Sequence, residues 1–137
     1  KRGMLELRVL PFMPQQAYDD LLAACDINFV RGEDSLVRAI WAGKPFVWHI
    51  YPQSDAAHLV KLDAFLDRFC NGLSAAADSA LRCFWHSWNA ETTSAGDWQQ
   101  FVLHLPEIAG HTLRWRAQLA QLTDLAATLA DFCRNRL

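Results

Sequence analysis

Apolar residues along this chain recur with two spacings, one typical of strands and one typical of helices. In the first half, three apolar-rich runs, at residues 5–13, 27–30 and 46–51, alternate with three segments of different pattern, at residues 15–25, 35–42 and 56–70. In those segments the apolar residues return every three or four positions, which is the spacing of an amphipathic helix. The apolar-rich runs are interpreted as strands, and the run at residues 46–51 is typical of a strand in a sheet covered on both faces.

The first half therefore has the order β-α-β-α-β-α with short links. Short right-handed crossovers between such strands predict an α/β fold with a parallel sheet. In the second half, helices are predicted at residues 75–88, 97–105 and 112–134, with a polar loop at 91–96 and a break at 106–110. We expect one domain, in which residues 1–72 form half of a doubly wound, Rossmann-like fold and residues 73–137 a mainly helical extension.

Composition narrows the class of protein. The chain has 137 residues, 52% hydrophobic and 20% charged, as expected of one globular domain with a core. The formal net charge of −2 recruits neither nucleic acid nor an anionic membrane, so neither is an expected partner.

Without an apolar run of about 18 residues or a signal peptide, we expect a cytoplasmic protein. The chain starts at Lys1 and enters a strand almost at once, so we interpret it as a piece of a longer protein.

The cysteines and histidines do not predict a metal site. Cys25, Cys70, Cys83 and Cys133 are widely spaced and lie within helical apolar patterns, which favours buried, reduced thiols. The histidines lack the mutual spacing of a zinc site, and His49 is interpreted as a core or edge residue of its strand.

Residues 31–35 carry the strongest candidate chemistry. Arg31, Gly32, Glu33, Asp34 and Ser35 stand between a predicted strand and a predicted helix. A helix start leaves about four backbone N–H groups unpaired and carries partial positive charge, so it is suited to an anion. Arg31 adds a planar, permanently charged donor beside it. The two carboxylates show that the site is more than a phosphate cradle.

Two further loops are expected at the same edge of the sheet, because the carboxyl ends of parallel strands meet there. The loop at residues 12–15 brings Phe12 and Gln15, and the loop at residues 51–55 brings Tyr51 and Gln53. Aromatic faces suit a base, carboxylates suit ribose or sugar hydroxyls, and the helix start with Arg31 suits a diphosphate. Together the three loops predict a nucleotide-sugar site.

Structural interpretations of the same residues remain open. Glu33, Asp34 and Ser35 are all favoured in the first turn of a helix, so they can be ordinary capping residues. Phe12 and Tyr51 can equally be core residues. Trp85 and Trp88 share one helix face and are expected to pack rather than to bind a ligand.

Residues 26–53 resemble the elongation factor P arginine rhamnosyltransferases. The likeness lies in residues 31–35 (RGEDS), 42–48 (AGKPFVW) and 50–53 (IYPQ), with the upstream strand end at residues 10–12 and Gln15. The resemblance implies a GT-B glycosyltransferase, an enzyme with two Rossmann-like domains that face each other across a cleft. This chain would be its C-terminal, donor-binding domain, and the N-terminal domain that holds the main catalytic base would lie outside it.

The family transfers rhamnose, with inversion, from dTDP-β-L-rhamnose to an arginine of translation elongation factor P, without a metal or another cofactor. The resemblance implies that Phe12 and Gln15 lie by the thymine, that Glu33 lies by the sugar or ribose in a supporting catalytic role, and that Tyr51 contacts the nucleotide. The donor-binding set implied, together with the loop residues above, is Phe12, Gln15, Arg31, Gly32, Glu33, Asp34, Ser35, Tyr51 and Gln53. The isolated chain would bind donor weakly and turn over nothing.

A second hypothesis comes from a different class of protein. The tryptophan-rich helices and the long final helix would make a non-catalytic interaction module that docks a partner protein or a sister domain. The residues at 33–35 would then only begin a helix.

Overall fold

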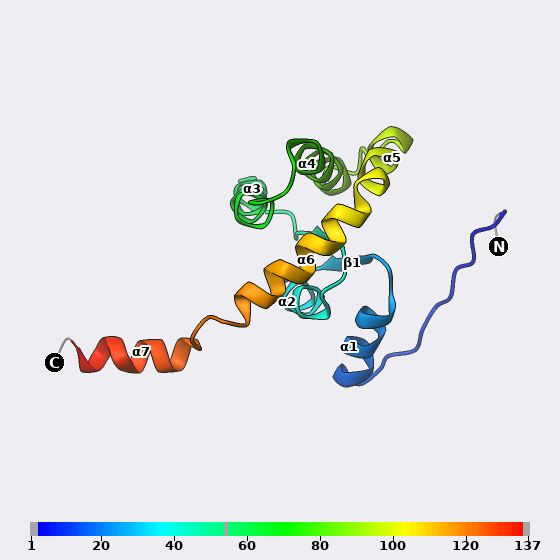
Figure 1. Cartoon of the computed structure of the whole chain (residues 1–137). Helices are drawn as coiled ribbons and strands as arrows, with labels where there is room; N and C mark the ends of the chain where they lie inside the picture. The colour runs from blue at the N-terminus through cyan, green and yellow to red at the C-terminus, as the bar shows by residue number, and fades with distance from the viewer. Residues whose placement is uncertain (1–2, 54, 136–137) are drawn as a thin grey trace.

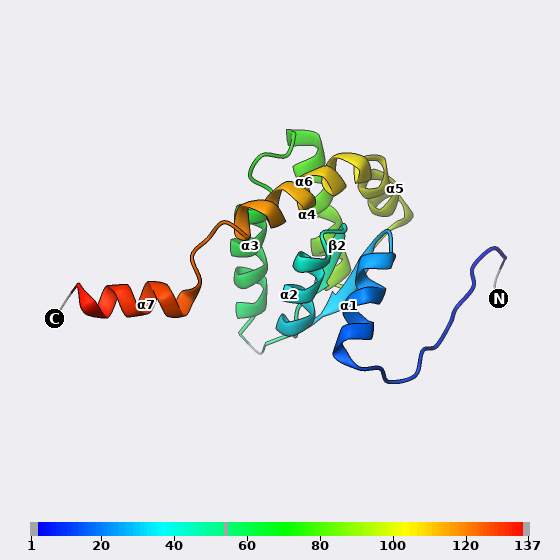
Figure 2. The same ribbon diagram turned by 60° about the horizontal axis from the view of Figure 1, so that its bottom comes forward.

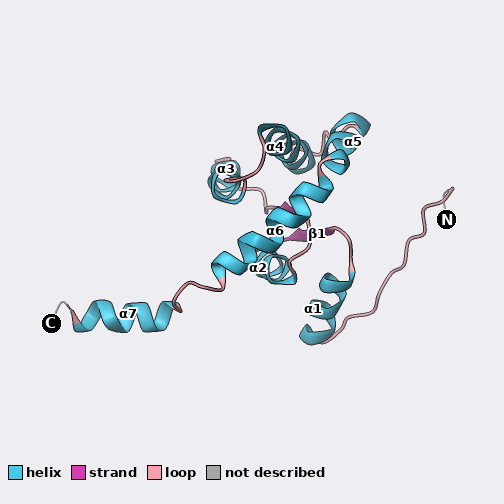
Figure 3. Ribbon diagram, viewed as in Figure 1, coloured by secondary structure: helices cyan, strands magenta, loops and turns pink. Residues whose placement is uncertain are grey.

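The computed structural model describes residues 3–53 and 55–135. Lys1 and Ser54, which enter two of the predictions above, lie outside the described residues. Within the described part, a two-stranded parallel sheet lies at the centre and helices surround it (Figures 1 and 3). The strands are β1 (Asn28–Arg31) and β2 (Phe46–His49), and the helices are α1 (Gln15–Ala24), α2 (Glu33–Ala42), α3 (Ala57–Phe69), α4 (Ala75–Asn89), α5 (Ala95–Leu103), α6 (Leu105–Leu119) and α7 (Leu125–Arg134).

The β1-α2-β2 unit follows the prediction closely. Asn28 pairs with Phe46 and Arg31 with His49, so both strands end at the same edge of the sheet. Gly43 ends α2 in a left-handed conformation with φ of 70°, which an amino acid without a Cβ adopts at little cost. The parallel sheet and short crossover expected from the sequence are therefore present.

Asn89, at the end of α4, closes the outer edge of β2 at its carboxyl end. Its side-chain amide donates to the carbonyl oxygen of Trp48 at 2.9 Å and accepts from the N–H of Ile50 at 2.9 Å. The same amide donates to the carbonyl oxygen of Trp85 within its own helix. One side chain thus takes the place that a neighbouring strand would occupy.

Two groups of aromatic rings fill the interior. Phe65 stacks on Trp85 with centroids 5.8 Å apart, and Phe46, Phe69 and Trp115 pack around this pair. In the second group, Phe84 stacks on Phe101 at 4.7 Å, beside Phe29, Trp88 and Trp98. Trp85 is fully buried, and Trp88 is half-buried against the core. The expectation that Trp85 and Trp88 pack is confirmed.

The strand predicted at residues 5–13 is wrong. Leu5 takes part in an isolated bridge, residues 6–13 carry no regular secondary structure, and this part of the chain extends away from the body (Figure 2). Its apolar side chains are exposed, among them Leu7, Val9 and Phe12. An apolar run becomes a strand only when its backbone pairs with a neighbour, and the sheet of the described residues consists of β1 and β2 alone.

The single long helix predicted at residues 112–134 is also wrong. The chain leaves α6 after Leu119, and Asp124 begins α7 by accepting a hydrogen bond from the N–H of Ala127 at 2.9 Å. Asp is a preferred N-cap residue, so the local bond favours a new helix over a continuous one. The break predicted at residues 106–110 lies inside α6 instead, because Pro106 occupies the first turn, where its missing N–H costs nothing.

The prediction for the cysteines holds in part. All four cysteines are free, and Cys70 is buried. Cys83 and Cys133 are exposed, so burial was wrong for these two. Cys133 lies on α7, which buries none of its residues because it lies apart from the rest of the fold (Figures 1 and 2).

Candidate functional site

The site is built around the turn between β1 and α2. Gly32 begins α2 with φ of 79° and ψ of 171°, a combination that is essentially restricted to glycine. Its carbonyl oxygen accepts a hydrogen bond from the indole N–H of Trp48 at 3.1 Å, and its N–H donates to the carbonyl oxygen of His49 at 3.4 Å. These bonds fix the turn to β2, so the start of α2 has a defined position at the carboxyl edge of the sheet.

No side chain caps the N-terminus of α2. Gly32 has no side chain to offer, and the carboxylate of Asp34 bonds to Arg38 instead. The interpretation of Glu33, Asp34 and Ser35 as hydrogen-bonding caps is therefore wrong, although two acidic residues in the first turn remain favourable toward the helix dipole. The backbone N–H groups of this turn are left for an acceptor from outside the helix.

Arg31 and Tyr51 meet over this turn. The guanidinium carbon of Arg31 lies 4.9 Å from the centroid of the Tyr51 ring, a cation–π contact. The same ring covers Gly32, since a Cβ added there would lie 2.8 Å from Cε2 of Tyr51. Tyr51 is 52% exposed, so about half of the residue stays open to solvent beside the helix start. Tyr51 is therefore a surface residue at the site, and the alternative interpretation of Tyr51 as a core residue is wrong.

The other predicted residues lie at different places. Gln15 is the first residue of α1 and accepts a hydrogen bond from Arg38 when its amide oxygen faces the guanidinium. Gln53 uses its backbone N–H to bond Nδ1 of His58 at 3.1 Å, and its side chain is exposed. Phe12 is fully exposed and is not brought against the turn; it is not a core residue either. The structure thus brings together Arg31, Gly32 and Tyr51, with Glu33, Asp34 and Ser35 in the first turn of α2.

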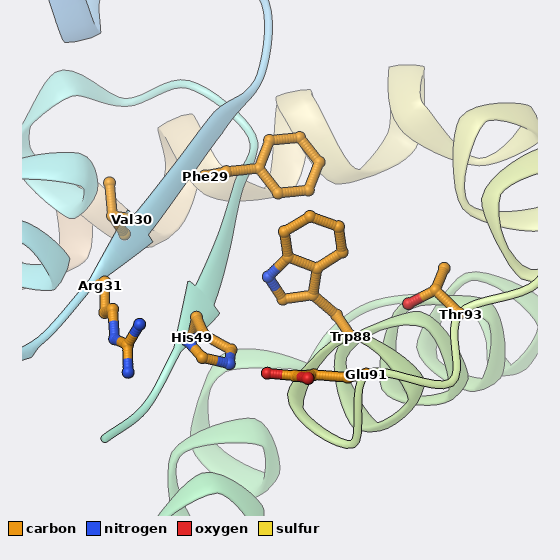
Figure 4. A pocket seen from close by; sticks show the side chains of 7 residues that line it. All are labelled: Phe29, Val30, Arg31, His49, Trp88, Glu91 and Thr93. Atoms are coloured by element: carbon orange, nitrogen blue, oxygen red, sulfur yellow. The ribbon is translucent and has the colours of Figure 1, made fainter. Parts of the chain in front are cut away.

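A cavity of about 500 Å³ opens beside Arg31 (Figure 4). It is lined by residues of β1, of the end of β2, of the end of α4 and of the connection from α4 to α5: Phe29, Val30, Arg31, His49, Trp88, Glu91 and Thr93. Its volume lies in the range of small-molecule sites, which is about 300–1,000 Å³. The cavity therefore extends the turn into a concave site with both apolar and charged walls.

Figure 4 shows how the cavity combines these walls. The indole of Trp88 lies against Phe29, with ring centroids 4.7 Å apart, and the carboxylate of Glu91 points toward the ring of His49. Glu91 has φ of 56°, an unusual backbone conformation for a residue with a side chain. Here it is the left-handed conformation that commonly follows a helix end, and the N–H of Thr92 bonds the carbonyl oxygen of Ser87 at 2.9 Å across it.

Sequence reasoning missed these residues. The sequence pattern favours a core or edge position for His49, whereas the structure shows it as the last residue of β2, where it lines the cavity. Glu91 and Thr93 belong to a predicted polar loop, and nothing in their local pattern indicates that this loop returns to the ends of the strands. One signal in the sequence could have placed His49 at the site. It ends its strand opposite Arg31 in a parallel pair, so both residues lie at the carboxyl edge of the sheet.

No group of three or more His, Cys, Asp or Glu residues is placed to hold a metal ion within residues 3–53 and 55–135. Within the same residues, no helix has both the length and the apolar character needed to cross a membrane.

A parallel strand pair with an open helix N-terminus at its carboxyl edge is the arrangement of a Rossmann-like, nucleotide-binding α/β domain. Comparison with known families makes the assignment specific. The family model of the Elongation-Factor P (EF-P) rhamnosyltransferase EarP matches residues 1–134. The chain therefore belongs to the EF-P rhamnosyltransferase family.

Known relatives agree with this assignment. The chain is 50% identical to the protein-arginine rhamnosyltransferase of Pseudomonas aeruginosa, with 96% of this chain and 35% of the relative covered. It is 48% identical to that of Pseudomonas putida, with 99% and 36% covered. A solved structure that describes EarP-mediated arginine glycosylation of translation elongation factor EF-P matches with a TM-score of 0.81 and 45% identity, over 95% of this chain and 41% of that chain.

Two conclusions follow from the comparisons. The expected fold class, a Rossmann-like parallel-sheet part of a GT-B glycosyltransferase with a helical extension, is confirmed. The chain spans about a third of the length of the curated relatives, each of which is named as a glycosyltransferase. The relatives support a glycosyltransferase domain, and the residue roles within it remain predictions.

Proposed function

We propose that this chain is the donor-binding domain of an inverting glycosyltransferase, one that transfers rhamnose from dTDP-β-L-rhamnose to an arginine of translation elongation factor P. The family match and the relatives' names support the transfer of rhamnose to arginine. The N-terminus of α2 beside Arg31 is the observation that carries the donor-binding role, because it offers backbone donors and a guanidinium to a diphosphate.

Each part of the donor has a proposed partner. Arg31 and the N–H groups at Asp34 and Ser35 hold the diphosphate, where charge develops as the sugar leaves. Glu33 accepts hydrogen bonds from hydroxyl groups of the ribose or the sugar and assists catalysis electrostatically. The remaining contacts to the nucleotide come from Phe12, Gln15, Gly32, Tyr51 and Gln53.

The main base is proposed to lie outside this chain. Inverting transfer needs a base on the face of the sugar opposite the leaving group, together with a positioned acceptor. The donor domain needs only to stabilise the departing diphosphate. The chain by itself should therefore bind the donor weakly and show no turnover, and no metal or other cofactor enters the proposal.

The interaction-module hypothesis has less support than donor binding. It relied on the tryptophans of the helices, of which Trp85 is buried and Trp88 and Trp115 are partly buried against the core, whereas Trp41 and Trp98 are exposed. The final helix α7 still presents apolar side chains to solvent, including Leu125 and Leu129. Docking by α7 and donor binding by α2 use different surfaces and are compatible.

An NMR titration of the ¹⁵N-labelled chain with dTDP tests donor binding. The amides of residues 32–35 and the ring of Tyr51 should shift, and Arg31→Ala should weaken binding by about 1.5–3 kcal/mol, the range for hydrogen bonds to a charged group. Arg68→Ala, which removes an equal charge from the far end of α3, should leave the affinity unchanged. Absence of shifts at residues 32–35 with millimolar dTDP would refute the proposal.

A further inference from the structure

Arg38 connects the two helices whose first turns carry proposed donor contacts. Its Nε donates to Asp34 at 2.9 Å, four residues earlier in α2. Its Nη1 donates to both carboxylate oxygens of Asp19 in α1, at 2.9 and 3.0 Å. Gln15, the first residue of α1, lies beside the same guanidinium and accepts from it when its amide oxygen faces Arg38. One side chain thus bonds the middle of α1 to the first turn of α2, and it lies against the first residue of α1.

The geometry is stronger than that of an ordinary surface ion pair. The side chain of Arg38 is only 19% exposed and lies between α1 and α2. Hydrogen bonds to Asp19 and then to Asp34 raise the pKa of Arg38 above its ordinary value. A planar guanidinium bonded to two carboxylates has little freedom to move, so it fixes the helices that it joins.

This link matters because a nucleotide is held at two points. The diphosphate is proposed to bind at the start of α2, and the base is proposed to bind near Gln15 at the start of α1. The diphosphate contact and the base contact form together without a free-energy cost of rearrangement only when the two helix starts already have the correct spacing in the free protein. Arg38 also neutralises Asp34, whose carboxylate would otherwise repel the diphosphate at close range.

We propose that Arg38 is a positioning residue for nucleotide binding, which holds Gln15 and the first turn of α2 at the spacing that a nucleoside diphosphate requires. The proposal rests on the proposed function of the site. It adds a residue that does not touch the ligand and acts through the elements it joins.

Asp19→Asn is the variant that separates positioning from charge. It weakens the bridge between the helices but leaves Arg38 and all residues of the proposed site in place. Its net charge is one unit more positive, so a purely electrostatic effect would strengthen the binding of every anion. Loss of positioning instead weakens only the ligand that needs both contacts.

Two probes measure this difference by NMR titration of the labelled chain. dTDP carries both a base and a diphosphate, whereas inorganic pyrophosphate engages only the start of α2. We expect Asp19→Asn to weaken dTDP binding about three- to tenfold, the range that lost preorganisation produces, and to leave pyrophosphate binding equal or slightly stronger.

The chain contains a matched control. Arg82 in α4 repeats the arrangement of Arg38: its Nε donates to Asp78, four residues earlier, and its Nη1 donates to Asp67 in α3 at 2.9 Å. Asp67→Asn weakens a similar bridge, between α3 and α4, that involves neither α1 nor α2. It should change the thermal midpoint by a similar amount and leave both affinities unchanged.

Each outcome decides for or against the proposal. Equal dTDP affinity in Asp19→Asn and in the unchanged chain overturns it, and so does an equal loss for both probes, which indicates general loss of structure. Arg38→Lys gives an independent reading, because lysine keeps the charge but cannot bond Asp19 and Asp34 in the same fork; unchanged dTDP affinity in this variant also overturns the proposal. Failure of the unchanged chain to bind dTDP refutes the proposed function instead.

Discussion

Gly32→Ala is the sharpest test of how the turn between β1 and α2 is built. The substitution adds one methyl group at φ of 79° and ψ of 171°, where a residue with a Cβ is strained. The added carbon would also lie 2.8 Å from Cε2 of Tyr51, closer than such atoms approach. The ring of Tyr51 must therefore move away, which breaks its contact with Arg31.

The expected cost can be worked out from these two effects. Backbone strain of this kind costs about 1–3 kcal/mol, and an exposed cation–π contact contributes about 0.5–1 kcal/mol. Replacing glycine by alanine also restricts the unfolded chain, which offsets the cost by about 0.4–1 kcal/mol. We expect a net loss of about 0.5–3.5 kcal/mol in the free energy of unfolding, together with weaker dTDP binding.

Urea unfolding followed by tryptophan fluorescence measures this loss. Gly72→Ala is the control for strain alone, because Gly72 has φ of 97° and its added Cβ would be 3.8 Å from the nearest atom, Cε1 of His111. Repeating Gly32→Ala in a Tyr51→Ala background removes the collision between the new methyl group and the ring. The difference between the two losses of unfolding free energy is the contribution of that collision.

Two results would refute this account of the turn. The first is a Gly32→Ala variant as stable as the unchanged chain, which would mean that the backbone is free to relax. The second is an equal cost of Gly32→Ala with and without Tyr51, which would mean that the ring does not press on the turn.

Three further predictions concern other parts of the fold. Asn89→Asp replaces an amide donor by a carboxylate that faces two carbonyl oxygens, and it should cost about 2–4 kcal/mol in urea unfolding, whereas equal stability would contradict the bonds to β2. Hydrogen bonds from the backbone N–H and hydroxyl of Ser74 lower the pKa of Glu107, so its stabilising contribution is present above the ordinary carboxyl pKa and is lost as the pH falls through the lowered value. Glu107→Gln should therefore flatten the fall in unfolding free energy below about pH 5, and an unchanged slope would argue against the bond. Burial raises the pKa of the Cys70 thiol to about 12, so iodoacetamide at about pH 8 should label exposed Cys133 in the folded chain and Cys70 only after unfolding, as mass spectrometry can show.

The parts of the site that sequence reasoning predicted depend on local chemistry. The turn at Gly32 needs a glycine, and acidic residues in the first turn of the following helix are favourable toward its dipole, so both appear in a short stretch of sequence. Tyr51 could be placed near this turn because the ends of parallel strands meet at one edge. Each of these inferences uses only neighbouring residues and the geometry of one crossover.

The parts that could not be predicted depend on distant partners. Residues 5–13 have the composition of a strand, yet pairing requires a neighbouring backbone, which local pattern does not specify. The apolar spacing across residues 112–134 persists through the break before Asp124, because periodicity does not record where a helix is capped. Glu91 reaches the cavity only through the packing of α4 against β2.

The amide of Asn89 determines which edge of the central sheet can pair with a further strand. Because it occupies the carbonyl of Trp48 and the N–H of Ile50, the carboxyl end of β2 offers no free backbone to an incoming strand. The bonds from the N–H groups of Asn28 and Gly32 to the β2 side leave the backbone of Phe29 and Arg31 facing the opposite edge, since residues alternate along a strand. At the end where the site lies, a third strand can join only beside β1, which places Arg31 in the interior of any wider sheet.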